Sequence, residues 1–221
     1  MRPLAIFGGT FDPVHYGHLR VAWEAAEALD AELLMVPSNV PPHRAQPGAS
    51  AQQRMAMLEL ALADQQRLRA DDRELRREGP SYTIDTLIAL RAEIGASRPL
   101  VLLVGADAFA GLSSWNRWRE LFEHAHVCML TRPGHGGVFE AELASEWFTR
   151  RVEDLAELRM RACGAIAAIE VTALDISSSA IRKLIASGGS PRFLLPPSVD
   201  DFIARSDLYR TPTSADDENN P

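Results

Sequence analysis

The sequence predicts an α/β fold, namely a Rossmann-like, three-layer, doubly wound parallel sheet in a single domain over residues 1–210. Short apolar runs, which are typical of strands buried on both faces, recur along the chain. Segments with helical spacing separate them, and this alternation implies right-handed crossovers between parallel strands. The length of 221 residues suits one such domain with a substantial core.

The apolar runs define the expected strands, which are 3–7, 32–36, 100–104, 126–130 and 168–172. The expected helices are one from about Gly17, then 51–63, 82–94, 115–122, part of 140–163, and 180–186. In such a sheet, ligands bind beyond the carboxyl ends of the strands, at the switch point of strand order. The strands at 3–7, 100–104 and 168–172 are each followed by polar or glycine-rich residues, so we expect these three ends to face one crevice.

Three segments are expected to lie outside the regular elements. Residues 37–50 are rich in Pro, Ser and Gly, which indicates a mobile surface loop near the site. The charged run 71–78 is expected to be mostly a solvated surface segment or an edge strand. Residues 211–221 are polar and acidic without apolar periodicity, which predicts a disordered tail.

Composition excludes several classes of function. The formal net charge of −7 argues against a nucleic-acid surface, which needs a basic patch. No apolar run approaches the roughly 20 residues that span a bilayer, and the N-terminus lacks the layout of a signal peptide. Cys128 and Cys163 lack metal-site spacing and are interpreted as buried thiols. A cytoplasmic protein without a membrane partner is therefore expected.

Residues 8–18, GGTFDPVHYGH, predict a polyphosphate site. Gly8 and Gly9 lack a Cβ atom, so the backbone can turn sharply and bring its N–H groups close to an anion. His15 and His18 fall near the start of a helix, whose free N–H groups also favour negative charge. A side chain at Gly17 would crowd the nucleotide. The alternatives are structural histidines at a capped helix, or a metal pair that lacks further ligands in a recognisable pattern.

A second anion site is predicted where Ser177, Ser178 and Ser179 precede the helix 180–186. These serines either cap the helix or present hydroxyl groups to a phosphate, with Arg182 adding a guanidinium in the first turn. Earlier in the chain, Gly105 and Asp107 follow the strand expected at 100–104. The Asp107 carboxylate either caps the next helix or accepts hydrogen bonds from ribose hydroxyls.

Aromatic and basic residues form a further group of candidates. Tyr82 and Trp115 are either core aromatics or ring-stacking residues. Trp115 lies in the polar turn SSWN, where burying an indole would be unfavourable. An exposed indole could instead stack on a cationic ring such as a pyridinium. His43 and Arg44 are either solvated charges or part of a flap that closes on phosphates. Arg132 is a weaker candidate of the same kind.

These candidate residues belong to a set of short sequence motifs that follow one another in a fixed order along the chain. Besides residues 8–18 it includes PPHR, DDRELRREGPSYTIDTL, LLVGADAF, SSWNRW, ISSSAIR and, near the end, LPPSVDDFIARSDLY. In this order and over nearly the whole chain, the set resembles the bacterial nicotinate-nucleotide adenylyltransferases, part of the superfamily of nucleotidyltransferases with an HxGH element.

The resemblance implies transfer of AMP from ATP to nicotinate mononucleotide by direct in-line attack, which forms nicotinic acid adenine dinucleotide and pyrophosphate in NAD biosynthesis. It implies catalytic roles for His15, His18 and Arg182. The implied ATP-binding residues are Gly8, Gly9, Thr10, Phe11, Gly17, Gly105, Asp107, Ile176, Ser177 and Ser178. The implied residues for nicotinate mononucleotide are His43, Arg44, Tyr82, Thr83, Trp115 and Asn116. Mg²⁺ would bind mainly through the ATP phosphates, with no metal site built by the protein.

Other functions stay open at this stage. The acceptor could be nicotinamide mononucleotide, whereas SYT and SSWNRW argue against phosphopantetheine. A non-catalytic ATP sensor on the same fold is a hypothesis from another class, because fold does not fix function. An RNA-binding synthetase fragment conflicts with the acidic charge. A homodimer is compatible with the sequence but rests on no feature of it.

Overall fold

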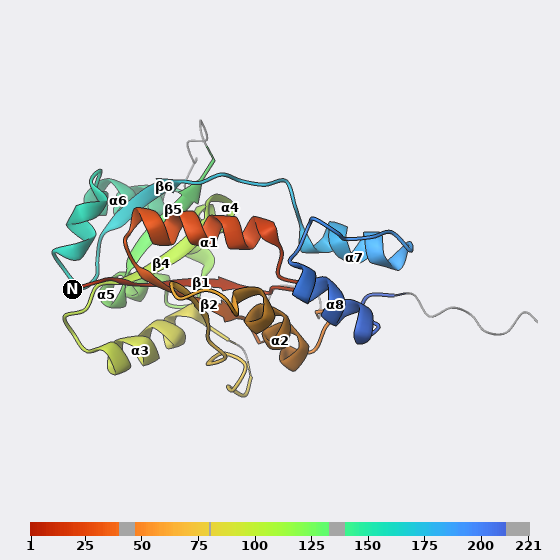
Figure 1. Ribbon diagram of the computed structural model, residues 1–221. Coiled ribbons are helices and arrows are strands. Elements are labelled where there is room, and N and C mark those ends of the chain that lie inside the picture. Colours follow the sequence, from red (N-terminus) through yellow and green to blue (C-terminus); the bar gives the residue numbers. More distant parts are fainter. Residues whose placement is uncertain (40–46, 80, 133–139, 211–221) are drawn as a thin grey trace, which may run out of the picture.

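The computed structural model describes residues 1–39, 47–79, 81–132 and 140–210. A six-stranded parallel sheet with the order β3-β2-β1-β4-β5-β6 forms its centre (Figure 1). The strands are β1 (Leu4–Gly9), β2 (Glu32–Pro37), β3 (Leu68–Ala70), β4 (Leu100–Gly105), β5 (His126–Thr131) and β6 (Ile166–Glu170). This order confirms the predicted doubly wound sheet and places the switch point between β1 and β4.

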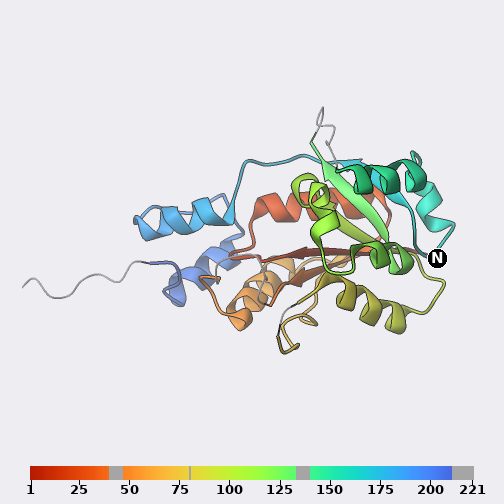
Figure 2. The same ribbon diagram turned by 180° about the vertical axis from the view of Figure 1, so that it is seen from behind.

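Helices cover both faces of the sheet. They are α1 (Tyr16–Ala28), α2 (Ala51–Leu62), α3 (Thr83–Ile94), α4 (Ala106–Ala110), α5 (Leu121–His124), α6 (Ala141–Arg150), α7 (Ser178–Ala186) and α8 (Pro197–Arg205). One core cluster holds side chains of α1, α2, α7 and α8, and the other holds those of α3 to α6. In Figure 2, α3 to α6 lie toward the viewer, whereas α7 and α8 extend beyond the sheet where β1 ends.

Alternation along the strands separates the two clusters. In β1, Ala5 belongs to the cluster with α1, while Leu4 and Ile6 belong to the cluster with α3. Because successive side chains of a strand point to opposite faces, an uninterrupted apolar run fills both layers at once. The runs that predicted the strands are therefore explained by burial on both faces.

Several expected elements need correction. The prediction of a helix at 115–122 is wrong. In its place, 3₁₀ turns at Leu112–Ser114 and Trp118–Glu120 precede the short helix α5. Arg117 has φ 53°, a left-handed conformation that interrupts a helix at this position. The last strand begins and ends two residues earlier than expected, and α7 also begins two residues earlier. Strand β3 and helix α8 were not predicted.

The charged run 71–78 is not mostly solvated, contrary to expectation. The Glu74 residue is 9% exposed, and the side chains of Asp71 and Arg73 are 16% and 15% exposed. These residues form turns that pack beside α3, where polar partners replace the lost water. Residues 40–46 of the predicted mobile loop and the whole of the predicted disordered tail, 211–221, lie outside the described residues.

The two cysteines differ in burial. Cys128 on β5 is fully buried, and burial raises the pKa of its thiol to about 12. Cys163 is half-buried, and its thiol donates to the carbonyl oxygen of Glu123. Both thiols are free, as predicted, although Cys163 is more accessible than expected. Within the described part of the chain, no helix is long and apolar enough to cross a membrane.

Candidate nucleotide-binding site

A cavity of about 430 Å³ opens at the carboxyl end of β1, beside the switch point of the sheet. Residues from the two segments that were predicted to bind phosphate, which lie far apart in the sequence, meet in this cavity. Its lining residues are Phe7, Gly8, Gly9, Thr10, Phe11, Asp12, His18, Pro47, Ser178, Ser179 and Arg182. The prediction that three strand ends face one crevice is therefore confirmed for the loop after β1 and the serine-rich segment, whereas Gly105 and Asp107 are not among the lining residues.

The turn after β1 is not formed by Gly8 and Gly9, contrary to the prediction from the sequence. Gly8 and Gly9 are the last residues of the strand and pair with β2, so they do not themselves form the turn. Phe11 does, with φ 48°, just before a cis peptide bond between Asp12 and Pro13. A Cβ atom on Gly9 would lie 2.8 Å from the Phe11 ring, whereas one on Gly8 would meet nothing within 4 Å. Gly9 thus makes room for the Phe11 side chain, and Gly8 leaves open space in the cavity.

His15 and His18 lie together at the start of α1. His15 is the N-cap residue and His18 lies in the first turn, with ring centroids 3.7 Å apart in a stacked arrangement. His15 is 4% exposed, and the Nδ1 atoms of both rings are buried without a hydrogen-bond partner among the residues described. Two neighbouring polar atoms without partners are costly unless a ligand satisfies them.

Burial keeps both histidines neutral at neutral pH. It lowers the pKa of His15 to about 4. It lowers the pKa of His18 to about 3, with a smaller contribution from His15. A neutral imidazole still carries one N–H donor, so both rings can donate a hydrogen bond to an anionic oxygen without being charged. The positive charge in the cavity comes from Arg182.

Gly17 is required for a reason other than the one expected. A Cβ atom at this position would lie 3.0 Å from the His15 ring and 3.3 Å from the carbonyl oxygen of Ile176. A side chain would therefore displace His15 and the segment before α7, rather than first crowding a nucleotide. The glycine allows α1 and the serine-rich segment to approach each other closely.

Asp12 lines the cavity and holds several of the residues around it in place. The sequence analysis did not identify this residue. It is 2% exposed, and its carboxylate accepts hydrogen bonds from the backbone N–H groups of Gly48 and Ala49 and from the hydroxyl of Tyr209. Burial and this carboxylate raise the pKa of the Tyr209 hydroxyl. Arg182 donates to the Asp12 carbonyl oxygen at 2.7 Å and lies 3.5 Å from its carboxylate. Asp12 thus holds Arg182 at the edge of the cavity.

The serines have separate roles. Ser177 is the N-cap of α7, and its hydroxyl accepts a hydrogen bond from the N–H group of Ala180, so the capping alternative is confirmed for this residue. The Ser178 hydroxyl donates to the carbonyl oxygen of Pro13, and Ser178 and Ser179 line the cavity. Because α7 begins at Ser178, Arg182 lies in its second turn rather than its first. Ile176 lines a different, apolar pocket, beside α1.

Gly105 and Asp107 lie at the end of β4, on the other side of the switch point. Gly105 is the N-cap of α4, and Asp107 lies in its first turn without capping it. The capping alternative for Asp107 is therefore wrong. Its exposed carboxylate can accept hydrogen bonds from a ligand at the carboxyl end of the sheet.

The residues predicted for the second substrate lie on the face that carries α3. Tyr82 is the N-cap of α3 and Thr83 is its first residue. Tyr82 and Trp115 are both half-buried and pack against the same core cluster, whereas Asn116 is exposed. None of these four lines the cavity at β1. His43 and Arg44 lie outside the described residues, and Arg132 is exposed.

Arg54 on α2 is a further residue that the sequence analysis missed. It is 1% exposed, and its guanidinium donates to the carbonyl oxygens of Thr10, Ser38 and Asn39 at 2.9, 2.7 and 3.1 Å. Burial lowers its pKa. By holding these carbonyl oxygens, Arg54 fixes the loop after β1 to the loop after β2. Its helical spacing from Met57 and Leu58, which places it on the apolar face, is the signal that could have revealed it.

Comparisons with known proteins bear directly on this site. The model of the cytidylyltransferase-like family matches residues 6–184. A probable nicotinate-nucleotide adenylyltransferase of Halorhodospira halophila is 46% identical over 213 residues, which cover 96% of this chain and 97% of the relative. A protein of the same name from Dechloromonas aromatica is 48% identical over 212 residues, covering 94% and 98%.

The chain belongs to the nicotinate-nucleotide adenylyltransferase family. Membership extends over essentially the full length of these relatives, so it covers the cavity at β1 and the residues around α3. The fold agrees with a solved structure described as Plasmodium falciparum nicotinic acid mononucleotide adenylyltransferase complexed with NaAD. That structure has a TM-score of 0.70 at 18% identity and covers 95% of this chain and 98% of its own. This likeness confirms the fold.

Proposed function

We propose that the protein transfers AMP from ATP to nicotinate mononucleotide, forming nicotinic acid adenine dinucleotide and pyrophosphate. The observation that carries the proposal is the cavity at β1, which is lined by His18, Ser178, Ser179 and Arg182, with the ring of His15 stacked on that of His18. A polyphosphate is the ligand that such donors favour. The family of the chain and the names of its relatives support the identity of the acceptor.

The reaction is a single displacement at the α-phosphorus of ATP. A phosphate oxygen of the acceptor forms the new P–O bond while the bond to the bridging oxygen of pyrophosphate breaks and that oxygen takes the electron pair. The second pKa of a phosphate monoester is about 6, so the acceptor is ionised at neutral pH and needs no general base. The protein therefore contributes alignment and stabilisation of charge.

Each group in the cavity has a task in this step. Arg182 is held by Asp12 and offers its positive charge to the phosphates. His15 and His18 donate N–H groups to oxygens whose negative charge grows in the transition state. The Ser179 hydroxyl can donate to a phosphate oxygen at the start of α7, where free backbone N–H groups also favour an anion. The Ser178 hydroxyl instead donates to the Pro13 carbonyl oxygen and so ties the start of α7 to the loop after β1.

Mg²⁺ is proposed to accompany ATP, bound through phosphate oxygens and water. In the described part of the chain, no cluster of three or more His, Cys, Asp or Glu residues is arranged to hold a metal ion. Asp12 is the carboxylate in the cavity lining, and four protein groups already engage it. The ion would neutralise part of the phosphate charge, which complements the single guanidinium of Arg182.

Preference for the acid form of the acceptor follows from the start of α3. The first N–H groups of a helix, here those of Thr83 and Ile84, have no intrahelical acceptor. A nicotinate carboxylate accepts hydrogen bonds through both oxygens, whereas an amide also presents an NH₂ group that needs an acceptor. Trp115, half-buried against the same core cluster as Tyr82, supplies an aromatic face for the pyridinium ring.

The test is pyrophosphate release from ATP and Mg²⁺ with nicotinate mononucleotide, nicotinamide mononucleotide and phosphopantetheine in parallel. We expect strong preference for nicotinate mononucleotide. An Arg182→Met variant is the matched control, because it retains the bulk of the side chain and loses the charge. If ATP binds but none of the three acceptors releases pyrophosphate, the protein is a nucleotide sensor and the proposal is wrong.

A further inference from the structure

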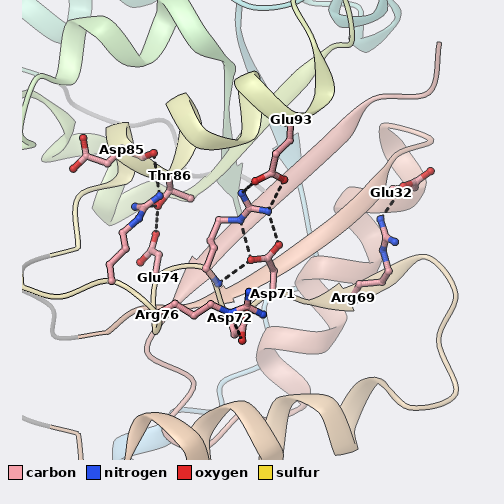
Figure 3. Close-up of polar contacts among 11 residues, drawn as sticks. Glu32, Arg69, Asp71, Asp72, Glu74, Arg76, Asp85, Thr86 and Glu93 are labelled. Carbon is pink, nitrogen blue, oxygen red and sulfur yellow. Dashed lines mark hydrogen bonds and ion pairs between the residues drawn. The ribbon is translucent and has the colours of Figure 1, made fainter.

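Glu74 lies in the charged run between β3 and α3, and its surroundings set it apart from the solvated acids nearby. It is 9% exposed, and both of its carboxylate oxygens accept hydrogen bonds at 2.7 Å. One donor is the Ser81 hydroxyl and the other is the Thr86 hydroxyl, which is buried in α3. Figure 3 shows Glu74 directed at Thr86 beneath the start of this helix.

The two donors lie on either side of the residues predicted for the acceptor. Ser81 precedes the N-cap Tyr82, and Thr86 lies in the first turn of α3, three residues after Thr83. A single carboxylate thus ties the segment before the helix to the helix itself. The backbone between these two anchors carries the free N–H groups of the first turn.

Arg77 completes the arrangement from the same charged run. Its guanidinium donates to the Thr86 hydroxyl at 2.9 Å and to the Asp85 carbonyl oxygen at 3.1 Å. The Thr86 hydroxyl therefore accepts from Arg77 and donates to Glu74, which fixes its rotamer. The Arg77 carbonyl oxygen in turn accepts from the side chain of Asn39, whose own carbonyl oxygen Arg54 holds. The start of α3 is thereby linked to the loops at β2 and β1.

We propose that Glu74 is a positioning residue for the acceptor site. It holds the segment from Ser81 to Thr86 so that Thr83 and the first N–H groups of α3 face the nicotinate carboxylate. This inference rests on the proposed function, because it concerns the acceptor of that reaction. It differs from a general stabilising role, because Glu74 contacts the predicted acceptor segment and does not line the cavity at β1.

The test compares Glu74→Ala and Glu74→Gln with a matched control, Glu93→Gln. Glu93 on α3 bonds Arg73 in the same charged run but is not a partner of Ser81 or Thr86 (Figure 3). KM is measured separately for ATP and for nicotinate mononucleotide. Losing two hydrogen bonds should raise the KM of nicotinate mononucleotide by about tenfold or more in Glu74→Ala. The KM for ATP should change less than about twofold.

The glutamine variant gives an intermediate value, because its amide oxygen can still accept one hydroxyl hydrogen bond while its NH₂ group faces the other hydroxyl. Thermal unfolding is measured in parallel. If Glu74→Ala does not fold, Ser81→Ala removes one anchor at the surface, and an increase of about threefold or more in the KM of nicotinate mononucleotide alone is expected.

Equal increases in both KM values, or a Glu74→Gln variant identical to Glu93→Gln, would overturn the inference. Wild-type protein distinguishes this from failure of the proposed function. If the wild type releases pyrophosphate with nicotinate mononucleotide while Glu74→Ala keeps its KM, Glu74 has no positioning role. If the wild type itself does not react with this acceptor, the proposed function is wrong.

Discussion

Replacing His15 by alanine should change how stability depends on pH. The His15 pKa in the folded protein is about 4, below the ordinary value of 6.5. Between these values, the unfolded chain binds a proton that the folded protein does not, so stability falls as pH falls. The contribution of His15 is fully present above pH 6.5 and is lost progressively as the pH decreases toward 4.

The size of the effect follows from the burial of the ring. His15 is 4% exposed, so little discount for solvent is needed. At pH 5 the unfolded histidine is protonated and the folded one is not, and one pKa unit corresponds to about 1.4 kcal/mol. The wild type should therefore lose about 2 kcal/mol of unfolding free energy from this residue between pH 8 and pH 5. His15→Ala should lose about 2 kcal/mol less over the same interval.

Urea unfolding of the ligand-free protein at both pH values measures this difference. Any cavity left by the ring lowers stability at both pH values, so it cancels in the comparison. Ser177→Ala is a suitable control, because it removes the hydroxyl that caps α7 without removing a titratable group. Equal losses of stability in wild type and His15→Ala would show that His15 is not held neutral, and the reasoning would fail.

Three further predictions concern the site. Ser177→Ala should lower the unfolding free energy by about 1 kcal/mol in a urea titration, because its hydroxyl caps α7; unchanged stability would contradict the N-cap role. Arg182→Lys should lower kcat about 10- to 100-fold, because an ammonium cannot reproduce the fork held by Asp12, and initial rates that match wild type would count against it. Trp115→Leu should raise the KM for nicotinate mononucleotide about fivefold and leave that for ATP unchanged, and steady-state kinetics with equal changes would argue against ring stacking.

The sheet could be predicted because its strands are buried on both faces. The runs at β1, β4 and β5 are almost purely apolar, and short runs of this kind are typical of strands at the centre of a parallel sheet. Strand β3 has three residues, of which Arg69 is exposed, so it leaves no periodic pattern. The helix expected around Trp115 failed because local sequence does not reveal that Arg117 adopts a left-handed conformation.

The part of the candidate site that could be predicted is the part that lies within short sequence motifs. His15, His18 and Arg182 could be proposed because they stand in short motifs whose side chains suit phosphate binding. Asp12 and Glu74 were missed because their roles depend on their partners in the folded chain. Asp12 meets Tyr209, 197 residues later, and Glu74 meets Thr86 through a buried contact that no spacing rule describes. A carboxylate in a sequence does not show whether water or protein satisfies it.

The central claim is that the protein aligns two substrates for one direct displacement and forms no covalent bond to AMP. The measurement that tests it most directly is the stereochemical course of transfer from ATP chirally labelled with sulfur at the α-phosphorus. A single in-line attack predicts inversion of configuration in the dinucleotide product. Retention would require two successive displacements through an adenylylated side chain, and would contradict the account.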